Sequence, residues 1–119
     1  MRIHHIGYLV RNVEKSIAAF EALGYVMGKP PVWDDGRLAR ICFLENDGYR
    51  IELIEPARES SLFPMLKQYA HAPYHMCYCC DQLESAIELL KAEKYMLFLP
   101  PAPAPAIGEN ARVAFLMSA

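Results

Sequence analysis

Two histidines and one glutamate have the residue types that a divalent metal site needs. His5 and His75 lie in two separate apolar segments. Glu52 stands between Ile51 and Leu53, where an ionised carboxylate is unfavourable unless it is paired or bound to a cation. Imidazole nitrogens and a carboxylate oxygen suit Zn, Fe, Co, Ni or Mn, so these residues predict a divalent metal ion without choosing among these elements.

Each of the three residues also has an ordinary structural explanation. A histidine in a strand can be a hydrogen-bonded structural residue, and a buried glutamate can pair with an arginine. The arginines considered as partners of Glu52 are Arg40, Arg50 and Arg112. The metal interpretation therefore depends on whether the fold brings the two imidazoles to the carboxylate.

An internal repeat places the two histidines at equivalent positions. Residues 3–25 align without a gap on residues 73–95, so that His5 meets His75. A second match follows in the same order and at nearly the same offset, with ARICFL at 39–44 and ARVAFL at 111–116. The two matches together predict a duplicated structural module.

The hydrophobic pattern predicts which elements each module contains. Module one (1–56) is expected to have a strand at 3–10, a helix near 13–23, a short strand at 25–28, a loop from Lys29 to Gly36, and strands at 37–45 and 49–55. A connector (57–72) includes a short helix near 61–69. Module two (73–119) is expected to have a strand at 73–80, a helix at 82–93, a strand at 95–99, a proline-rich loop from Pro100 to Asn110 and a strand at 111–117.

Local signals mark the ends of these elements. Asn12 is expected to cap the first helix, and Asp81 with Glu84 to form a capping box at the second. The Asp47-Gly48 step predicts a tight hairpin between two strands. The acidic turn at 34–36 is expected to be solvated.

Strand alternation predicts which side chains share a face. His5 is expected to point with Gly7, while His4 points to the opposite, helix-covered face together with Tyr8. In the strand at 49–55, Glu52 shares its face with the neighbours two residues away. The candidate ligands are therefore expected to line the open side of a sheet.

Composition excludes several classes of protein. The chain has 119 residues, 54% of them hydrophobic, and a net charge of −2, which fits a single domain and does not favour nucleic acid as a partner. No apolar run approaches the ~20 residues of a membrane helix, and the N-terminus does not resemble a signal peptide. The four cysteines are expected to be free thiols. We therefore expect a cytoplasmic protein with no membrane partner.

Four segments together resemble the vicinal oxygen chelate superfamily, which includes glyoxalases, bleomycin-resistance proteins and methylmalonyl-CoA epimerases. They are HHIGYLV at 4–10, YRIELIEP at 49–56, YHMCYCCDQLESAI at 74–87 and ARVAFLM at 111–117. The resemblance implies an α+β fold of paired βαβββ modules that form an open half-barrel, with His5, Glu52 and His75 as metal ligands. The position equivalent to Glu52 in module two would fall after Ala119, so the last strand and its carboxylate are not expected here.

The resemblance implies three alternative functions. The first is a metal-dependent lyase or isomerase acting next to a carbonyl or thioester, with Glu52 as the catalytic carboxylate that moves a proton. The second is a homodimer that binds a small molecule without chemistry, as bleomycin-resistance proteins do. The aromatic residues Trp33, Tyr49 and Phe98 are then expected to line its cavity. The third is an inactive, truncated member.

Overall fold

The strand β1 (Arg2–Leu9) pairs with two other strands of the sheet that carries the candidate site. The computed structural model describes residues 1–118, in which β1 pairs with β5 (Tyr49–Pro56) in parallel and with β6 (Ala72–Cys79) antiparallel. The order of strands is β2-β4-β5-β1-β6, with β2 at Val26–Met27, β4 at Ala39–Asn46, and β3 (Val32–Asp34) paired to β4. Strands that are distant in the sequence are therefore neighbours beside β1.

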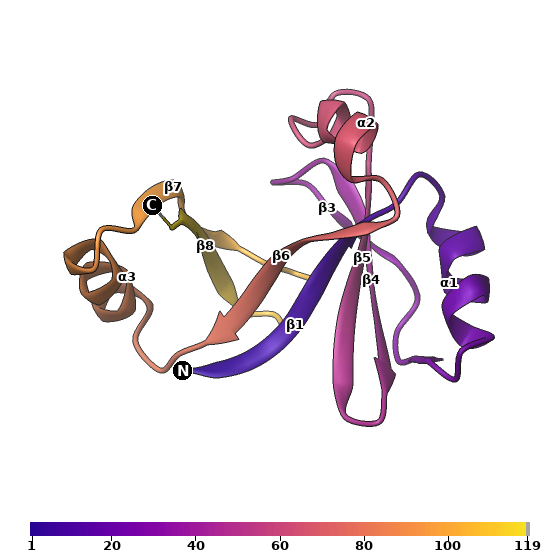
Figure 1. Ribbon diagram of the computed structural model, residues 1–119, viewed down its shortest axis with the longest axis horizontal. Coiled ribbons are helices and arrows are strands. Elements are labelled where there is room, and N and C mark those ends of the chain that lie inside the picture. The colour runs from indigo at the N-terminus through magenta and orange to yellow at the C-terminus, as the bar shows by residue number, and fades with distance from the viewer. Residues whose placement is uncertain (119) are drawn as a thin grey trace.

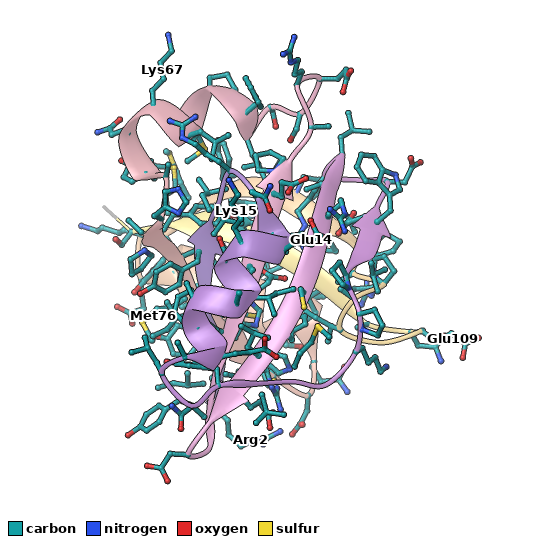
Figure 2. The ribbon with its side chains drawn as sticks, turned by 90° about the vertical axis from the view of Figure 1, so that its right-hand side faces the viewer. Arg2, Glu14, Lys15, Lys67, Met76 and Glu109 are labelled. Carbon is teal, nitrogen blue, oxygen red and sulfur yellow. The ribbon has the colours of Figure 1, made fainter. Side chains whose placement is uncertain are left out.

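Helix α1 (Val13–Glu21) covers one face of this sheet. Its first turn is capped as expected, because the side chain of Asn12 accepts a hydrogen bond from the backbone N–H of Lys15. Figure 2 shows α1 lying across the strands with Glu14 and Lys15 at its solvent-exposed start. The apolar stripe of the helix faces the sheet, where Val13 and Ile17 are buried.

The two faces of the sheet carry separate apolar clusters. On the helix face, α1 packs on alternate residues of β4 and β5; the buried members are Val10, Val13, Ile17, Cys42, Leu44, Ile51 and Leu53. On the other face the buried members are Leu9, Ala39, Ile41, Ile54 and Leu66. The predicted alternation is thus confirmed for β5, and Glu52 lies on the face that α1 does not cover.

The expected hairpin between β4 and β5 is present. Asp47 and Gly48 at its tip have φ values of 53° and 81°, which is the left-handed conformation that a two-residue hairpin turn requires. The hairpin keeps β5 in register with β4, so that Phe43 pairs with Glu52.

The second half of the chain forms a smaller unit. Helix α3 (Leu83–Ala92) packs on a separate two-stranded sheet of β7 (Met96–Pro103) and β8 (Arg112–Met117), which lies on the other side of β6 from β1 (Figure 1). In the first half β5 lies between β1 and β4. Within residues 1–118 no strand lies between the equivalent pair β6 and β8, so the half-barrel remains open there.

Three local expectations were wrong. The loop predicted at 29–36 contains β3, and β7 continues through three prolines to Pro103, which is tolerated because the β7–β8 pairing is irregular at this end. The capping box at α3 is absent, because Gln82 occupies the N-cap position without a side-chain hydrogen bond and Glu84 pairs with Arg112 instead.

The connector contains the short helical segment that the sequence predicts. The connector holds a short 3-10 turn, η1 (Phe63–Met65), that continues into α2 (Leu66–Tyr69). All four cysteines are free. None of the helices in residues 1–118 is long and apolar enough to span a membrane.

Candidate metal centre

His5, Glu52 and His75 meet at one point. His5 Nε2 lies 3.1 Å from His75 Nε2 and 3.3 Å from Glu52 Oε1, and His75 Nε2 lies 3.5 Å from the same oxygen. Three donors at about 2.0–2.1 Å from a tetrahedral ion are separated by about 3.3 Å from one another. The spacing of these atoms therefore fits a divalent metal ion, as the sequence predicted.

Gly7 is the position around which the three candidate ligands are arranged. It pairs with Glu52 of β5 on one side and with His75 of β6 on the other. A Cβ atom built on Gly7 would lie 2.7 Å from His75 Nε2 and closer still to Cε1 of that ring. Only glycine leaves room for the His75 imidazole over β1.

Irregular pairing between β1 and β6 shapes the site further. The register shifts between Gly7 and Tyr8, so that Tyr74 of β6 is an extra residue opposite β1. The Tyr74 hydroxyl and His75 Nδ1 are buried without a hydrogen-bond partner within residues 1–118. Both atoms can still take a hydrogen-bond partner, as buried polar groups normally do.

Glu52 pairs with an arginine that is not among the three predicted from the sequence. Arg37 Nη2 lies 3.2 Å from Glu52 Oε2, and Arg37 Nε lies 3.0 Å from Asp34 Oδ2. The arginines proposed from the sequence bind other carboxylates: Arg40 pairs with Glu14 and Glu55, Arg50 with Glu45, and Arg112 with Glu84.

The turn that holds Arg37 also differs from the prediction, because its first residue is buried. Asp34 was expected to be solvated, yet it is buried, and its Oδ1 accepts the backbone N–H of Arg37 at 3.0 Å. The following residue, Leu38, has a φ of 52°, so the chain turns sharply into β4 after presenting the guanidinium. The Asp-x-x-Arg spacing directly before a strand is the sequence signal that could have identified this pair.

The electrostatics of the site favour a cation. Asp34, Arg37 and Glu52 are two carboxylates and one guanidinium, so together they carry a formal charge of −1. Burial alone would raise the pKa of Glu52, but the hydrogen bond from His5 and the charge of Arg37 more than offset it and hold that pKa at about 2. Burial lowers the pKa of His75 to about 4. At neutral pH, Glu52 is thus ionised and His75 is neutral, as metal ligands must be.

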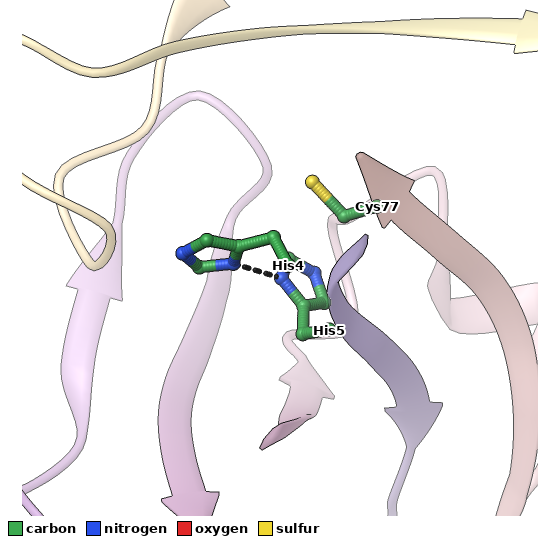
Figure 3. Close-up of side chains that lie close together, drawn as sticks. All are labelled: His4, His5 and Cys77. Atoms are coloured by element: carbon green, nitrogen blue, oxygen red, sulfur yellow. Dashed lines mark hydrogen bonds between the residues drawn. The ribbon is translucent and has the colours of Figure 1, made fainter. Parts of the chain in front are cut away.

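His4 does not lie where strand alternation placed it. Its Nδ1 lies 2.7 Å from His5 Nδ1 and its Nε2 lies 2.6 Å from Arg50 Nη1. Figure 3 shows the two rings in contact, with Cys77 of β6 beside them, and one potential ligand atom from each residue lies within 4.8 Å of the others. Burial, with a further effect of Glu52, raises the pKa of Cys77 to about 11, so this group remains a thiol.

The two halves of the fold surround the site with equivalent aromatic residues. The ring of Phe43 packs edge-on against His5 with 5.1 Å between centroids, and Phe115 packs in the same way against His75 at 5.6 Å. These phenylalanines occupy matching positions in the internal repeat. They exclude water from one side of each of the two imidazole rings.

A cavity of about 380 Å³ lies beside His4 and Phe43, which pack against His5, but none of the three candidate ligands lines it. Its lining includes His4, Lys29, Ile41, Phe43, Arg50 and Ile107. The aromatic residues expected from the sequence to line a cavity are exposed and do not border this one: Trp33, Tyr49 and Phe98. The cavity is instead formed by the open face of β4 and β5 and by the loop before β8.

Solved structures with the same fold include epimerases. A hypothetical protein from Bacillus halodurans C-125 superposes with a TM-score of 0.83 at 23% identity, over 97% of this chain and 83% of that one. Methylmalonyl-CoA epimerase from Mycobacterium tuberculosis superposes with a TM-score of 0.82 at 18% identity, over 97% and 77% of the two chains. A Streptomyces coelicolor methylmalonyl-CoA epimerase variant in complex with 2-nitronate-propionyl-CoA gives 0.81 at 17% identity, over 98% and 86%.

These likenesses establish the fold, and the family follows from a sequence comparison. No curated protein sequence matches the chain significantly. The sequence profile of one family, however, matches residues 4–115, which is nearly the whole chain and includes all three candidate ligands. The protein therefore belongs to the Glyoxalase/Bleomycin resistance protein/Dioxygenase superfamily, the vicinal oxygen chelate group that its sequence resembles.

Proposed function

We propose that this protein is a metal-dependent lyase or isomerase that acts on a carbon next to a carbonyl or thioester. The observation that carries the proposal is the convergence of His5, Glu52 and His75 within 3.1–3.5 Å of one another in a buried site. The superfamily membership and the epimerase-like fold support it. The ion can be Zn, Co, Ni, Mn or Fe, since the donor set suits each of them.

The residues of the chain have distinct roles in this proposal. A bound divalent ion would supply Lewis-acid polarisation of the carbonyl oxygen. His5, Glu52 and His75 would hold the ion, and Arg37 keeps Glu52 anionic and fixed in position. Phe43 and Phe115 exclude water, which strengthens the electrostatic interactions around a developing enolate.

Glu52 is also the proposed proton-transfer group, because it is the one carboxylate among the three donors. A pKa of about 2 makes it a weak base, since general-base catalysis is most effective when the pKa lies near the working pH. We therefore expect proton exchange to be slow and to depend on acidification of the substrate by the metal ion.

An acyl-CoA thioester is the substrate to test first. The solved relatives include a methylmalonyl-CoA epimerase in complex with methylmalonyl-CoA. The cavity of about 380 Å³ beside His4 and Phe43 carries the cation of Lys29, which suits an anionic acyl group such as that of methylmalonyl-CoA, while its Arg50 already pairs with Glu45. A thiol adduct of an α-ketoaldehyde, the substrate class of glyoxalases, is the second substrate to test.

The experiment measures metal content and α-proton exchange in parallel. Protein purified without chelator is expected to contain close to one equivalent of a transition metal by mass spectrometry, and to exchange the α-proton of methylmalonyl-CoA for deuterium in D₂O. His75→Ala should lose both properties. His71→Asn is the matched control, because His71 is exposed and has a φ of 61° that asparagine tolerates. A metal-free parent protein that cannot be reloaded would overturn the proposal.

A non-catalytic binding protein is the second candidate, and one observation favours it. Arg37 already pairs with the buried carboxylate of Glu52, so this group has a cationic partner even without a metal ion. In that case a small-molecule ligand should bind equally well to chelator-treated protein and to His5→Ala. An inactive family member would show neither metal-dependent exchange nor saturable ligand binding.

Two further proposals concern the state of the protein in the cell. We expect a homodimer, because one edge of β6 and one edge of β8 are unpaired within residues 1–118 and unpaired edges favour association. We also expect it in the cytoplasm, where four free thiols persist. Sedimentation velocity at several concentrations tests the first expectation.

A further inference from the structure

The hydrogen bonds around His4 run in one direction. An arginine can only donate, so at 2.6 Å the Nε2 atom of His4 accepts from Arg50. The single N–H of a neutral His4 must then be on Nδ1, which lies 2.7 Å from His5 Nδ1. Because His5 Nδ1 accepts this bond, the proton of a neutral His5 must be on Nε2.

The hydrogen bonds from Arg50 to His4 and from His4 to His5 form a relay, and a bulge in β1 makes this relay geometrically possible. Ile3 pairs with Tyr78 and His5 pairs with Cys77, so His4 is an extra residue without a partner on β6. The bulge turns the His4 ring toward His5, and Phe43 packs edge-on against it with 5.9 Å between centroids. Without the bulge His4 would point to the face that carries α1.

The direction of the relay matters for cation binding at Nε2 of His5. A metal-bound histidine ordinarily binds through the lone pair of one nitrogen and donates the other N–H to an acceptor. In His5 the arrangement is reversed, because Nε2, the atom facing Glu52 and His75, carries the proton while Nδ1 faces a donor. An ion at the site must therefore displace a proton that Arg50 and His4 hold in place.

We propose that Arg50 and His4 are positioning residues that hold His5 as its Nε2–H tautomer and thereby weaken cation binding at the His5–Glu52–His75 site. This inference rests on the metal site proposed above. The same tautomers disfavour a second, softer metal site at His4, His5 and Cys77, because the Nδ1 atoms of both histidines are occupied by their mutual hydrogen bond.

The first measurement locates the protons in metal-free protein. Long-range ¹H–¹⁵N correlation spectra distinguish the two histidine tautomers, and His4→Phe, which keeps a ring against Phe43, identifies the His4 signals. We expect His4 as Nδ1–H and His5 as Nε2–H in the wild type and in Arg50→Lys, which retains a donor. Arg50→Gln offers an acceptor, so a His4 Nε2–H population should appear. A wild-type His5 protonated on Nδ1 would overturn the inference.

The second measurement is zinc affinity by competition with a chromophoric chelator. Arg50→Gln should bind zinc about tenfold more tightly than the wild type, the size of effect expected for a changed partner of a ligand histidine. Lys29→Gln removes a positive charge from the same cavity without contacting His4, and should change the affinity by much less. Equal changes in both variants would show that charge alone acts and would contradict the relay.

Two outcomes separate this inference from the proposed function. Cys77→Ser should leave zinc affinity unchanged, and loss of binding in that variant would favour the His4–His5–Cys77 site instead. If neither the wild type nor any variant binds zinc, the proposed function and the effect on affinity are both refuted. The tautomer spectra then decide the direction of the hydrogen bonds independently.

Discussion

The guanidinium of Arg37 lies against the carboxylate of Glu52, with 3.2 Å between Nη2 and Oε2, and the pair is shielded from water. Arg37 reaches Glu52 from the turn before β4, and Asp34 holds it there through two hydrogen bonds. This ion pair makes the buried carboxylate tolerable and keeps it ionised, which is the state that a metal ligand requires.

Removing Arg37 should destabilise the metal-free protein strongly. Arg37→Met leaves Glu52 as a buried charge without its guanidinium, and breaking a buried pair in this way costs about 3–5 kcal/mol. The free energy of unfolding in urea with chelator measures the loss. Arg40→Met removes an arginine from a largely exposed pair with Glu14 and should lose less than about 1 kcal/mol. Similar losses in the two variants would show that the Arg37 pair is unimportant.

Zinc should stabilise the wild type and not a variant that lacks the carboxylate. At a free concentration one hundredfold above Kd, binding to the folded state adds about 2.7 kcal/mol to the free energy of unfolding. Glu52→Gln is expected to lose this increment, and Glu59→Gln, at an exposed position, is expected to keep it. Thermal unfolding with and without zinc makes the comparison. An undiminished shift in Glu52→Gln would place the ion elsewhere.

Gly7→Ala should disturb the site through His75. The new methyl group would overlap the imidazole, so the ring or β6 must move, and such overpacking costs about 1–3 kcal/mol. Zinc affinity should fall together with stability. Gly28→Ala is the matched control, since a Cβ there meets no atom within 4 Å. Retained zinc affinity in Gly7→Ala would mean that His75 is not a ligand.

The stability of the metal-free protein should decrease as the pH falls from 6.5 to 4. The pKa of His75 is lowered from 6.5 to about 4, so between these values the unfolded chain binds the proton that the folded protein excludes. Above pH 6.5 the imidazole is neutral in both the folded and the unfolded state, so this effect on the free energy of unfolding is absent. At pH 4 it lowers the free energy of unfolding by about 3 kcal/mol. His75→Gln should show a flatter profile in urea unfolding across this range, and an unchanged slope would contradict the burial of a neutral His75.

The same linkage applies to Glu52 at lower pH. Its pKa is held at about 2, below its ordinary value of 4.5, so its stabilising contribution is present above pH 4.5 and is lost as the pH falls toward 2. In metal-free Glu52→Gln this second decrease should be absent. The two variants therefore separate the histidine and the carboxylate contributions by their pH ranges.

The amino-acid sequence by itself determined most of the elements and identified the three candidate ligands. Some signals depend only on residues that are close in the sequence, so their structural outcome can be predicted from it. These are the hydrophobic period, the Asn12 cap and the Asp47-Gly48 turn. The repeat paired His5 with His75, and alternation put Glu52 on the open face; the structure joins all three. The positions of these residues follow from local geometry that every β-strand obeys.

Only the tertiary structure decided what surrounds the ligands. Arg37 pairs with Glu52 because β4 and β5 bring a turn and a strand together, whereas charge and composition alone equally allowed Arg40, Arg50 or Arg112. His4 contacts His5 because a bulge interrupts the alternation, and a bulge arises from the register between β1 and β6. Pairings between distant segments depend on the packing of the whole sheet, which no local pattern in the chain encodes.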